Sequence, residues 1–234
     1  AGYAVPRFDG NAYENNRFNL DRGSNYRSGQ WASTIRYHNG KFYVGFCMPT
    51  AIGNVGQGYF CMSVADDVKG PWKRTLFPEC LYDPGLFFDD DGSPYVVHGQ
   101  KENYLTPLAK DALSVAGKSV KISGDKACEG SHMYKINGKY YIFSPAGGHG
   151  AQRCFRSDNL HGPYESKVVL YDTRNVRYGI IQGGLVQLKN GDWWCLIVEG
   201  RDPMGRTTRL EPVTWVDGWP MIGKGSWLNS PSHS

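Results

Sequence analysis

Residues 133–144 read MYKINGKYYIFS, and this stretch decides the fold class. An apolar-alternating run leads into Asn137-Gly138, and a second run rich in aromatic and β-branched residues follows. An Asn-Gly pair between two such runs is a strong signal for a β-hairpin, because it favours turns with positive φ that match strand twist. The stretch therefore predicts two antiparallel strands joined by a tight turn.

The same pattern occurs three more times along the chain. The other copies are IRYHNGKFYVGF at 35–46, LFFDDDGSPYVVHG at 86–99 and LVQLKNGDWWCLIV at 185–198. Successive turn glycines, at 40, 92, 138 and 191, lie 52, 46 and 53 residues apart. That period is typical of four-stranded propeller blades of roughly 40–50 residues. We therefore predict an all-β fold, a β-propeller, with a β-sandwich of unrelated hairpins as the alternative.

A second signature predicts the outer edge of the blades. MSVADDVKGPWKR and FRSDNLHGPYESK both end in Gly-Pro-aromatic, and PLAKDALSVAGK is a looser version of the same pattern. Each predicts a polar strand and a tight turn. We expect a single domain over residues 1–234, with blades at 31–80, 81–125, 126–175 and 176–234.

Composition and charge narrow the classes of partner. The 30 Gly, 13 Pro, 15 Tyr, 10 Phe and 7 Trp suit turns and pleated strands. The net charge is only +4, and Lys and Arg are scattered, so no nucleic-acid partner is expected. No apolar stretch approaches the roughly 18 residues that span a bilayer, so no membrane partner is expected either. The start, AGYAVPRFDG, lacks the features of a signal peptide and leaves the compartment open.

Six cysteines stand mostly in apolar runs and show no CxxC spacing. They do not predict a zinc site. We expect buried free thiols that act as small hydrophobic side chains, and a disulfide between Cys47 and Cys61 is the alternative.

The residues just before each hairpin are expected to converge near the propeller axis. They are Trp31, Asp83, Glu129 and Gln182, spaced 52, 46 and 53 residues apart in step with the turns. Two carboxyl groups with an aromatic wall and an amide donor are the parts that glycoside hydrolysis uses. Carboxylates satisfied by local backbone groups are the structural alternative.

Longer motifs resemble glycoside hydrolase family 43. They are WASTIRYHNGKFYV, GPWKRTLFPECLYDPGLFFDDDG, EGSHMYKINGKYYIFSPAGG, RSDNLHGPYE, QGGLV and LEPVTWVDGWP, and they cover nearly the whole chain. The resemblance implies a five-bladed propeller that acts on arabinose- or xylose-containing polysaccharides. The motifs look most like the branch of exo-acting α-L-arabinofuranosidases and β-xylosidases.

The resemblance also implies roles for individual residues. Glu129 in EGSHMYK matches the general acid of the family, and Asp83 in YDPGLFF matches the carboxylate that tunes and orients that acid. Trp31 matches an aromatic of the sugar-binding wall, although a core tryptophan fits the sequence nearly as well. Arg206 in GRTTRLEPVTW matches an arginine near the bound sugar, with a surface arginine as the alternative.

Two further positions are expected near the sugar. Gln182 is expected to be a polar donor near the axis, with a purely structural role as the alternative. His132, three residues after Glu129, is expected to stand behind the residues that contact the sugar.

The general base of the family is not found. It is an aspartate before a proline near the start of the first blade, but the two Asp-Pro pairs here are Asp83-Pro84 and Asp202-Pro203. The opening GYAVPRF resembles the end of that blade, so residues 1–30 are expected to be its remnant and a connection. Asp9, Glu14 and Asp21 are the nearby acidic candidates, and none has the expected surroundings.

The metal site implied by the family is also altered. Many members carry a histidine before QGG that can bind a central calcium ion, whereas this chain has Ile181. No cofactor is therefore expected, and calcium binding is doubtful.

Three explanations of the absent base stay open. The chain can be a fragment of a longer enzyme, a shortened product that closes or pairs with a second copy, or a carbohydrate-binding module that has lost the chemistry. The first two lead to an inverting glycosidase that removes L-arabinofuranosyl or D-xylosyl units, and the third to a glycan-binding propeller. An open propeller also exposes strand edges and apolar blade faces, which favours a homo-oligomer that covers the open edge. A structural propeller that binds protein is the remaining alternative.

Overall fold

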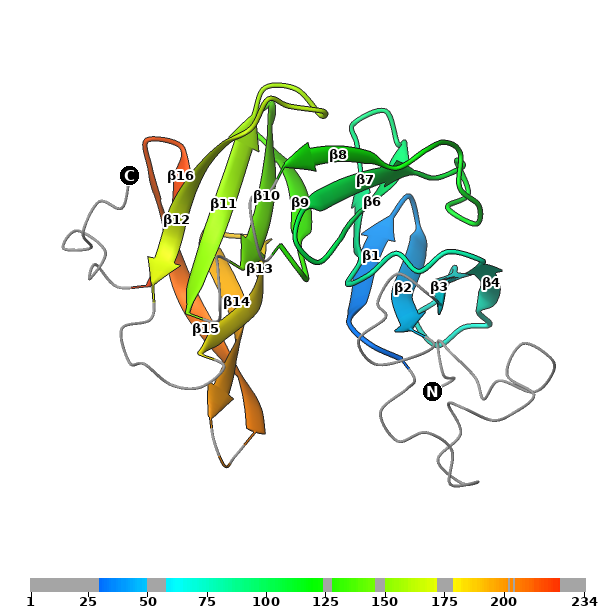
Figure 1. Cartoon of the computed structure of the whole chain (residues 1–234), viewed down its shortest axis with the longest axis horizontal. Coiled ribbons are helices and arrows are strands. Elements are labelled where there is room, and N and C mark those ends of the chain that lie inside the picture. Colours follow the sequence, from blue (N-terminus) through cyan, green and yellow to red (C-terminus); the bar gives the residue numbers. More distant parts are fainter. Residues whose placement is uncertain are drawn as a thin grey trace. The chain divides into compact units, whose positions relative to one another are not determined.

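The computed structural model describes residues 30–49, 58–123, 128–145, 150–171, 179–201, 203 and 205–223. Within these ranges every regular element is a strand. The strands form four four-stranded antiparallel sheets, and in each sheet every strand pairs with the next one along the chain (Figure 1). The predicted all-β class is confirmed, and four separate meanders do not fit the alternative of a two-sheet sandwich. In the described part of the chain, no helix could span a membrane.

The first two sheets lie in the first half of the chain. The first comprises β1 (Ser33–His38), β2 (Lys41–Pro49), β3 (Gly58–Ala65) and β4 (Lys73–Phe77). The second comprises β5 (Gly85–Phe88), β6 (Pro94–His98), β7 (Asn103–Pro107) and β8 (Val120–Ser123).

The other two sheets follow in chain order. The third comprises β9 (His132–Ile136), β10 (Lys139–Pro145), β11 (Ala151–Ser157) and β12 (Glu165–Tyr171). The fourth comprises β13 (Ile180–Gln187), β14 (Trp193–Arg201), β15 (Gly205–Val216) and β16 (Trp219–Ile222). The predicted blade limits and the single domain over residues 1–234 stay predictions.

Two of the four predicted hairpin turns are two-residue turns with positive φ. In the β1–β2 turn Asn39 and Gly40 have φ of 47° and 78°, and in the β9–β10 turn Asn137 and Gly138 have 51° and 78°. In the β5–β6 and β13–β14 turns only the glycine has positive φ, because those loops are longer. Backbone hydrogen bonds close them from Asp89 to Ser93 and from Leu188 to Asp192.

The Gly-Pro-aromatic signature lies where the sequence predicts. It directly precedes β4 and β12, which are terminal strands of their sheets. The expectation of an edge strand after this signature is therefore confirmed for the first and third sheets, and its outer position stays a prediction.

The chain divides into two compact units, and each has its own core. The first unit comprises residues 1–99 and 104–120, and the second comprises residues 100–103 and 121–234. The main core of the first unit contains Tyr43, Phe60, Met62, Phe77, Leu81, Leu86, Val96, Leu108 and Ala112. That of the second contains Tyr141, Phe143, Cys154, Val169, Ile180, Leu185, Cys195, Ile197, Trp219, Met221 and Ile222.

The fourth sheet has one buried and one exposed apolar face. Cys195 and Ile197 of β14 are buried in the core, whereas Leu196 between them is 52% exposed. Leu196 pairs with Leu210 of β15, which is 56% exposed. The exposed face of the fourth sheet therefore carries a pair of neighbouring apolar side chains.

The strand register excludes the Cys47–Cys61 disulfide. Cys47 lies opposite Phe60, and Cys61 lies opposite Phe46. Because side chains alternate between faces along a strand, the two cysteines point to opposite faces of the sheet. All six cysteines are free thiols and all but Cys80 are buried, so the expectation of buried free thiols is confirmed for five of them.

Candidate active site

Asp83 lies in the turn that leads into β5 and is 5% exposed. Its φ of 47° falls in the left-handed region, which aspartate adopts more readily than most residues but which still costs free energy. Two hydrogen bonds flank the turn: Gly99 N donates to Tyr82 O at 3.0 Å, and Leu86 N donates to the side-chain hydroxyl of Thr34 at 3.1 Å. A buried carboxylate held in a strained conformation marks a candidate functional site.

Trp31 lies beside this turn. Its backbone N–H donates to Cys47 O at 3.0 Å. Its ring meets the ring of Tyr82 edge to face, with 6.0 Å between centroids and 63° between planes. The structure thus brings Trp31 to the residue next to Asp83, while its contact with a sugar stays a prediction.

The thiol partner of Cys47 is Cys80. The two side chains are hydrogen-bonded to each other, and the backbone N–H of Asp83 donates to the sulfur of Cys47. The hydrogen bond with Cys80, together with burial, raises the pKa of Cys47 well above its ordinary value. Cys47 therefore stays a neutral thiol that packs against the Asp83 turn.

His98 ends β6 near the same turn, since the following Gly99 bonds to Tyr82. Its Nε2 lies 2.8 Å from Thr106 Oγ1, which lies 2.5 Å from Ser119 Oγ. Burial lowers the pKa of His98 to about 4, so the ring is neutral at neutral pH. The sequence does not single out His98, because one histidine at the end of an apolar strand has no local signature.

Glu129 lies in the turn before β9, in the second unit, and is half-buried. Gly130 follows it with a φ of 65°. A Cβ added to Gly130 would lie 2.3 Å from Cδ of Gln182, so a larger residue does not fit. The turn that carries Glu129 therefore packs directly against the side chain of Gln182.

Gln182 reaches this turn because it is the extra residue of a β-bulge. The β13–β14 register passes from Ile181 opposite Val198 to Gly183 opposite Ile197. A bulge changes the direction in which a side chain points, compared with the regular alternation along a strand. The structure thus brings the side chain of Gln182 next to Gly130, the residue after Glu129, while its contact with a sugar stays a prediction.

His132 is the first residue of β9 and lies beside β13. A Cβ added to Gly184 would lie 3.7 Å from Cδ2 of His132. Two residues further along, the hydroxyl of Tyr134 accepts a hydrogen bond from Leu185 N at 2.8 Å. The ring of His132 is therefore next to β13, and its place behind the sugar contacts stays a prediction.

Arg206 is the second residue of β15, lies opposite Gly200 and is exposed. Its contact with a sugar stays a prediction. The adjoining part of the sheet holds a carboxylate that the sequence patterns do not reveal: Glu199 is 1% exposed, with Arg209 Nη1 3.6 Å from its Oε1. The partly exposed Arg209 therefore compensates the buried charge of Glu199. Loss of one partner of such a pair is costly, because the other charge is left buried and unpaired.

Several predicted positions lie outside the described residues. These are the acidic residues Asp9, Glu14, Asp21 and Asp202 and the proposed first-blade remnant up to residue 29. Ile181 lies in β13, but its side chain is not described. An isoleucine carries no donor atom for a metal, so the calcium site implied by the family does not fit this position. Among the described residues no group of three or more His, Cys, Asp or Glu could hold a metal ion.

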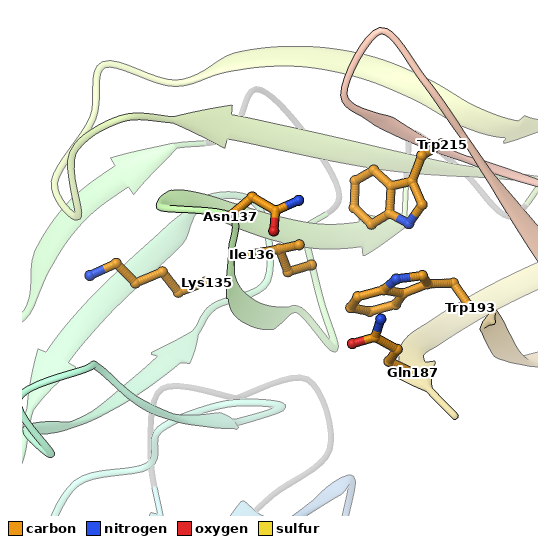
Figure 2. Close-up of a pocket in the computed structure, with 6 residues that line it drawn as sticks. All are labelled: Lys135, Ile136, Asn137, Gln187, Trp193 and Trp215. Carbon is orange, nitrogen blue, oxygen red and sulfur yellow. The ribbon is translucent and has the colours of Figure 1, made fainter. Parts of the chain in front are cut away.

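A cavity of about 290 Å³ lies at the opposite end of β9 from Glu129. It is lined by Lys135, Ile136, Asn137, Gln187, Trp193 and Trp215 (Figure 2). The two indoles meet edge to face at 5.4 Å, and Trp215 packs in the same way on Tyr141. The five residues of β9 separate the cavity from the Glu129 turn by roughly 17 Å. The cavity is therefore distinct from the Glu129 site.

The chain resembles one family over most of its length. The sequence model for glycosyl hydrolases family 43 matches residues 11–220. The non-reducing end alpha-L-arabinofuranosidase of Bacteroides ovatus is 34% identical, over 88% of this chain and 44% of its own length. A xylosidase/arabinosidase of Butyrivibrio fibrisolvens is 30% identical, over 84% of this chain and 44% of its own length. The chain thus spans less than half the length of these curated relatives.

Solved structures carry the same fold. A bifunctional GH43-CE protein of Bacteroides eggerthii matches 95% of this chain and 29% of its own, at 35% identity and a TM-score of 0.79. The GH43 protein BlXynB of Bacillus licheniformis matches 83% of this chain and 43% of its own, at 32% identity and a TM-score of 0.73. The four meander sheets are therefore blades of a β-propeller, as the period of the hairpins predicts.

Proposed function

The chain belongs to glycoside hydrolase family 43, and we propose that it is an exo-acting, inverting glycosidase. Its substrates are L-arabinofuranosyl or D-xylosyl units of hemicellulose-type polysaccharides or oligosaccharides, the sugars in the names of its relatives. One observation carries the proposal. Asp83 and Glu129 occupy the same position, the turn before the first strand, in two consecutive sheets.

In this mechanism Glu129 is the general acid. It donates a proton to the glycosidic oxygen as the bond to the sugar breaks, and its half-buried position suits contact with a substrate. Asp83 supplies the negative charge that tunes the acid. Trp31 packs on the sugar, Gln182 and Arg206 donate hydrogen bonds to it, and His132 supports these contacts from behind.

Inversion needs a second carboxylate that activates a water molecule on the opposite face of the sugar. Asp9, Glu14 and Asp21 are the acidic residues of the first 30 positions, and none is followed by proline. The mechanism assigns the base to none of them. The hydrolytic activity therefore depends on whether this chain, or a longer protein that contains it, supplies that carboxylate.

Turnover of 4-nitrophenyl α-L-arabinofuranoside and β-D-xyloside tests the proposal. We expect release of nitrophenol above the blank, and NMR should show the first-formed sugar with an anomeric configuration opposite to that of the substrate. A first product with retained configuration would contradict the inverting mechanism. Release from internal positions of a long arabinoxylan, without free pentose, would contradict exo action.

A second candidate function is a glycan-binding propeller that lacks the general base. The observation in its favour is that no Asp-Pro pair precedes Asp83 in the chain. Calorimetric titration with xylo- and arabino-oligosaccharides separates the two. Binding without any pentose release would support the binding module and overturn hydrolysis by this chain. Absence of both would favour a structural propeller.

We propose that the site needs no cofactor and no metal. Isoleucine at position 181 offers no ligand where the family often places a histidine. Treatment with EDTA followed by desalting should leave turnover and the thermal midpoint unchanged. Restoration of lost turnover by calcium would contradict this.

We also propose that the chain forms a homo-oligomer through the exposed face of the fourth sheet, and that neither nucleic acid nor a membrane is a partner. Leu196 and Leu210 are paired across β14 and β15 and are half-exposed. A second copy would remove this apolar area from water. Light scattering should show a concentration-dependent dimer that Leu196→Lys disrupts. A monomer at all concentrations would contradict this.

A further inference from the structure

A buried polar network holds the turn that carries Glu129. Its members are Asn103, Ser123, Ser131 and Ser144, all of which belong to the second unit. Asn103 and Ser144 are fully buried, and Ser131 is 1% exposed. Buried polar groups without partners cost free energy, so a group of this kind is stable only when its members satisfy one another.

Ser131 is the member that closes the turn. Its hydroxyl contacts Cys128 O at 3.0 Å, across the two residues Glu129 and Gly130. The same hydroxyl lies 2.6 Å from Asn103 Oδ1 and 2.5 Å from Ser144 Oγ. A hydroxyl has one proton to donate and can accept from other donors. Asn103 Oδ1 and Cys128 O share the proton of Ser131 as acceptors, and Ser144 can donate to Ser131.

Asn103 fixes the orientation of Ser131 from outside the turn. Its Nδ2 donates to Ser123 Oγ at 3.0 Å and lies 3.5 Å from Ser144 Oγ. The amide thus uses its donors on two serines while its oxygen faces Ser131. Because the amide is anchored at both ends, it holds the Ser131 hydroxyl in one orientation, and Ser131 holds the turn.

Gln182 also contacts the turn, because its side chain fills the space beside Gly130. Both neighbours of Glu129 are therefore held in place, Gly130 by packing against Gln182 and Cys128 by its hydrogen bond with Ser131. Glu129 itself is half-buried and stays partly exposed to solvent.

We infer that Asn103 is a positioning residue for the general acid, acting through Ser131. This rests on the proposed role of Glu129. Placement matters in acid catalysis, since a displacement of about 1 Å can cost roughly 100-fold in rate. The cost falls mainly on substrates with poor leaving groups, because good leaving groups need little protonation.

The test compares Asn103→Ala with Ser123→Ala. The control variant removes one acceptor of Asn103 but leaves the contact of Asn103 with Ser131. For Asn103→Ala we expect kcat/KM to fall about 10- to 100-fold on unsubstituted xylobiose or arabinobiose, and less than about 3-fold on 2,4-dinitrophenyl glycosides. Ser123→Ala should show a small loss that does not depend on the leaving group.

If Asn103→Ala lowered kcat/KM equally on all substrates, the inference would be overturned, because Asn103 would then have a merely structural role. Glu129→Gln measured on the same series separates this failure from that of the proposed function. If Glu129→Gln shows no dependence on the leaving group, the acid assignment fails instead.

Hydrogen–deuterium exchange supplies a readout that does not need turnover. In Asn103→Ala the peptide 128–132 should exchange faster, while the β10 peptide 139–143 should exchange as in the unaltered chain. Unchanged exchange of 128–132 would show that Asn103 does not hold the turn, even if the chain proved to bind glycans without hydrolysing them.

Discussion

The turns that carry Asp83 and Glu129 occupy equivalent places in the second and third sheets but are built differently. In the first, the carboxylate residue itself adopts the left-handed conformation and is almost fully buried. In the second, the following Gly130 adopts that conformation, and Glu129 stays half-buried. Asp83 is therefore buried, whereas Glu129 is partly exposed to solvent.

This difference suits two separate tasks. A carboxylate that acts only through its charge can be buried and rigid, provided its surroundings satisfy it. A carboxylate that donates a proton must reach the reacting oxygen, so its side chain has to stay accessible while its backbone is fixed. The burial of Asp83 matches the first demand, and the partial exposure of Glu129 matches the second.

The largest expected effect comes from Glu129→Gln. Loss of the proton donor should lower kcat/KM on a substrate with a poor leaving group by about 1,000-fold, within the range of acid catalysis. Glu79→Gln, at an exposed position of the first unit, is the matched control and should change turnover little. An unchanged rate for Glu129→Gln would place the acid elsewhere.

Gly130→Ala tests whether the Glu129 turn is held by close packing. Alanine at position 130 would have to adopt the left-handed conformation, and its Cβ would overlap with the side chain of Gln182. Gly40→Ala is the control, because φ is 78° there but nothing lies within 4 Å of the added Cβ. We expect Gly130→Ala to unfold at lower urea and to lose turnover, and Gly40→Ala to lose only the backbone cost of about 1–2 kcal/mol.

Combining Gly130→Ala with Gln182→Ala removes the overlap between the two side chains. The free-energy cost of the left-handed conformation of alanine remains. The double variant should therefore be more stable than Gly130→Ala alone. Additive losses from the two substitutions would contradict the close packing of these residues.

The smallest predicted effect concerns stability near the Asp83 turn. His98 is neutral in the folded chain, whereas an unfolded chain binds a proton below about pH 6.5. Stability should therefore fall as pH decreases through 6.5 and level off below pH 4. From pH 7.5 to 5 this contributes a loss of about 2 kcal/mol.

His98→Gln should flatten this part of the pH dependence, as measured by urea unfolding at several pH values. His161→Gln, at an exposed position, is the control and should leave the slope as it is. An equal slope in the unaltered chain and His98→Gln would mean that the ring is not neutral when folded.

Much of the fold could be predicted because hairpin chemistry is local. Asn137-Gly138 and Asn39-Gly40 adopt the positive φ angles that their sequence favours. Asp91-Gly92 looks equivalent in sequence, yet its loop is longer and only the glycine has positive φ. The fixed spacing also predicts equivalent repeat positions for Gln182 and Glu129, although the bulge at Gln182, which brings its side chain to Gly130, has no sequence signature.

The support of the candidate site could not be predicted, because it depends on contacts between distant residues. Ser131 meets Asn103 across 28 positions, and no local pattern connects an asparagine at a strand start with a serine in a turn. For the same reason the sequence left a Cys47–Cys61 disulfide open as an alternative, which the strand register excludes. Register and burial decide such pairs, and both arise only when the sheets are assembled.

The most direct test of the assignment is kcat/KM for Asp83→Asn on substrates with poor and good leaving groups. Asparagine also tolerates the left-handed conformation, so the substitution removes the charge and keeps the turn. If Asp83 supports the acid, kcat/KM should fall far more on unsubstituted xylobiose or arabinobiose, which need a proton on the leaving oxygen, than on 2,4-dinitrophenyl glycosides. An equal fall on both kinds of substrate would contradict the role of Asp83 as the carboxylate that supports Glu129.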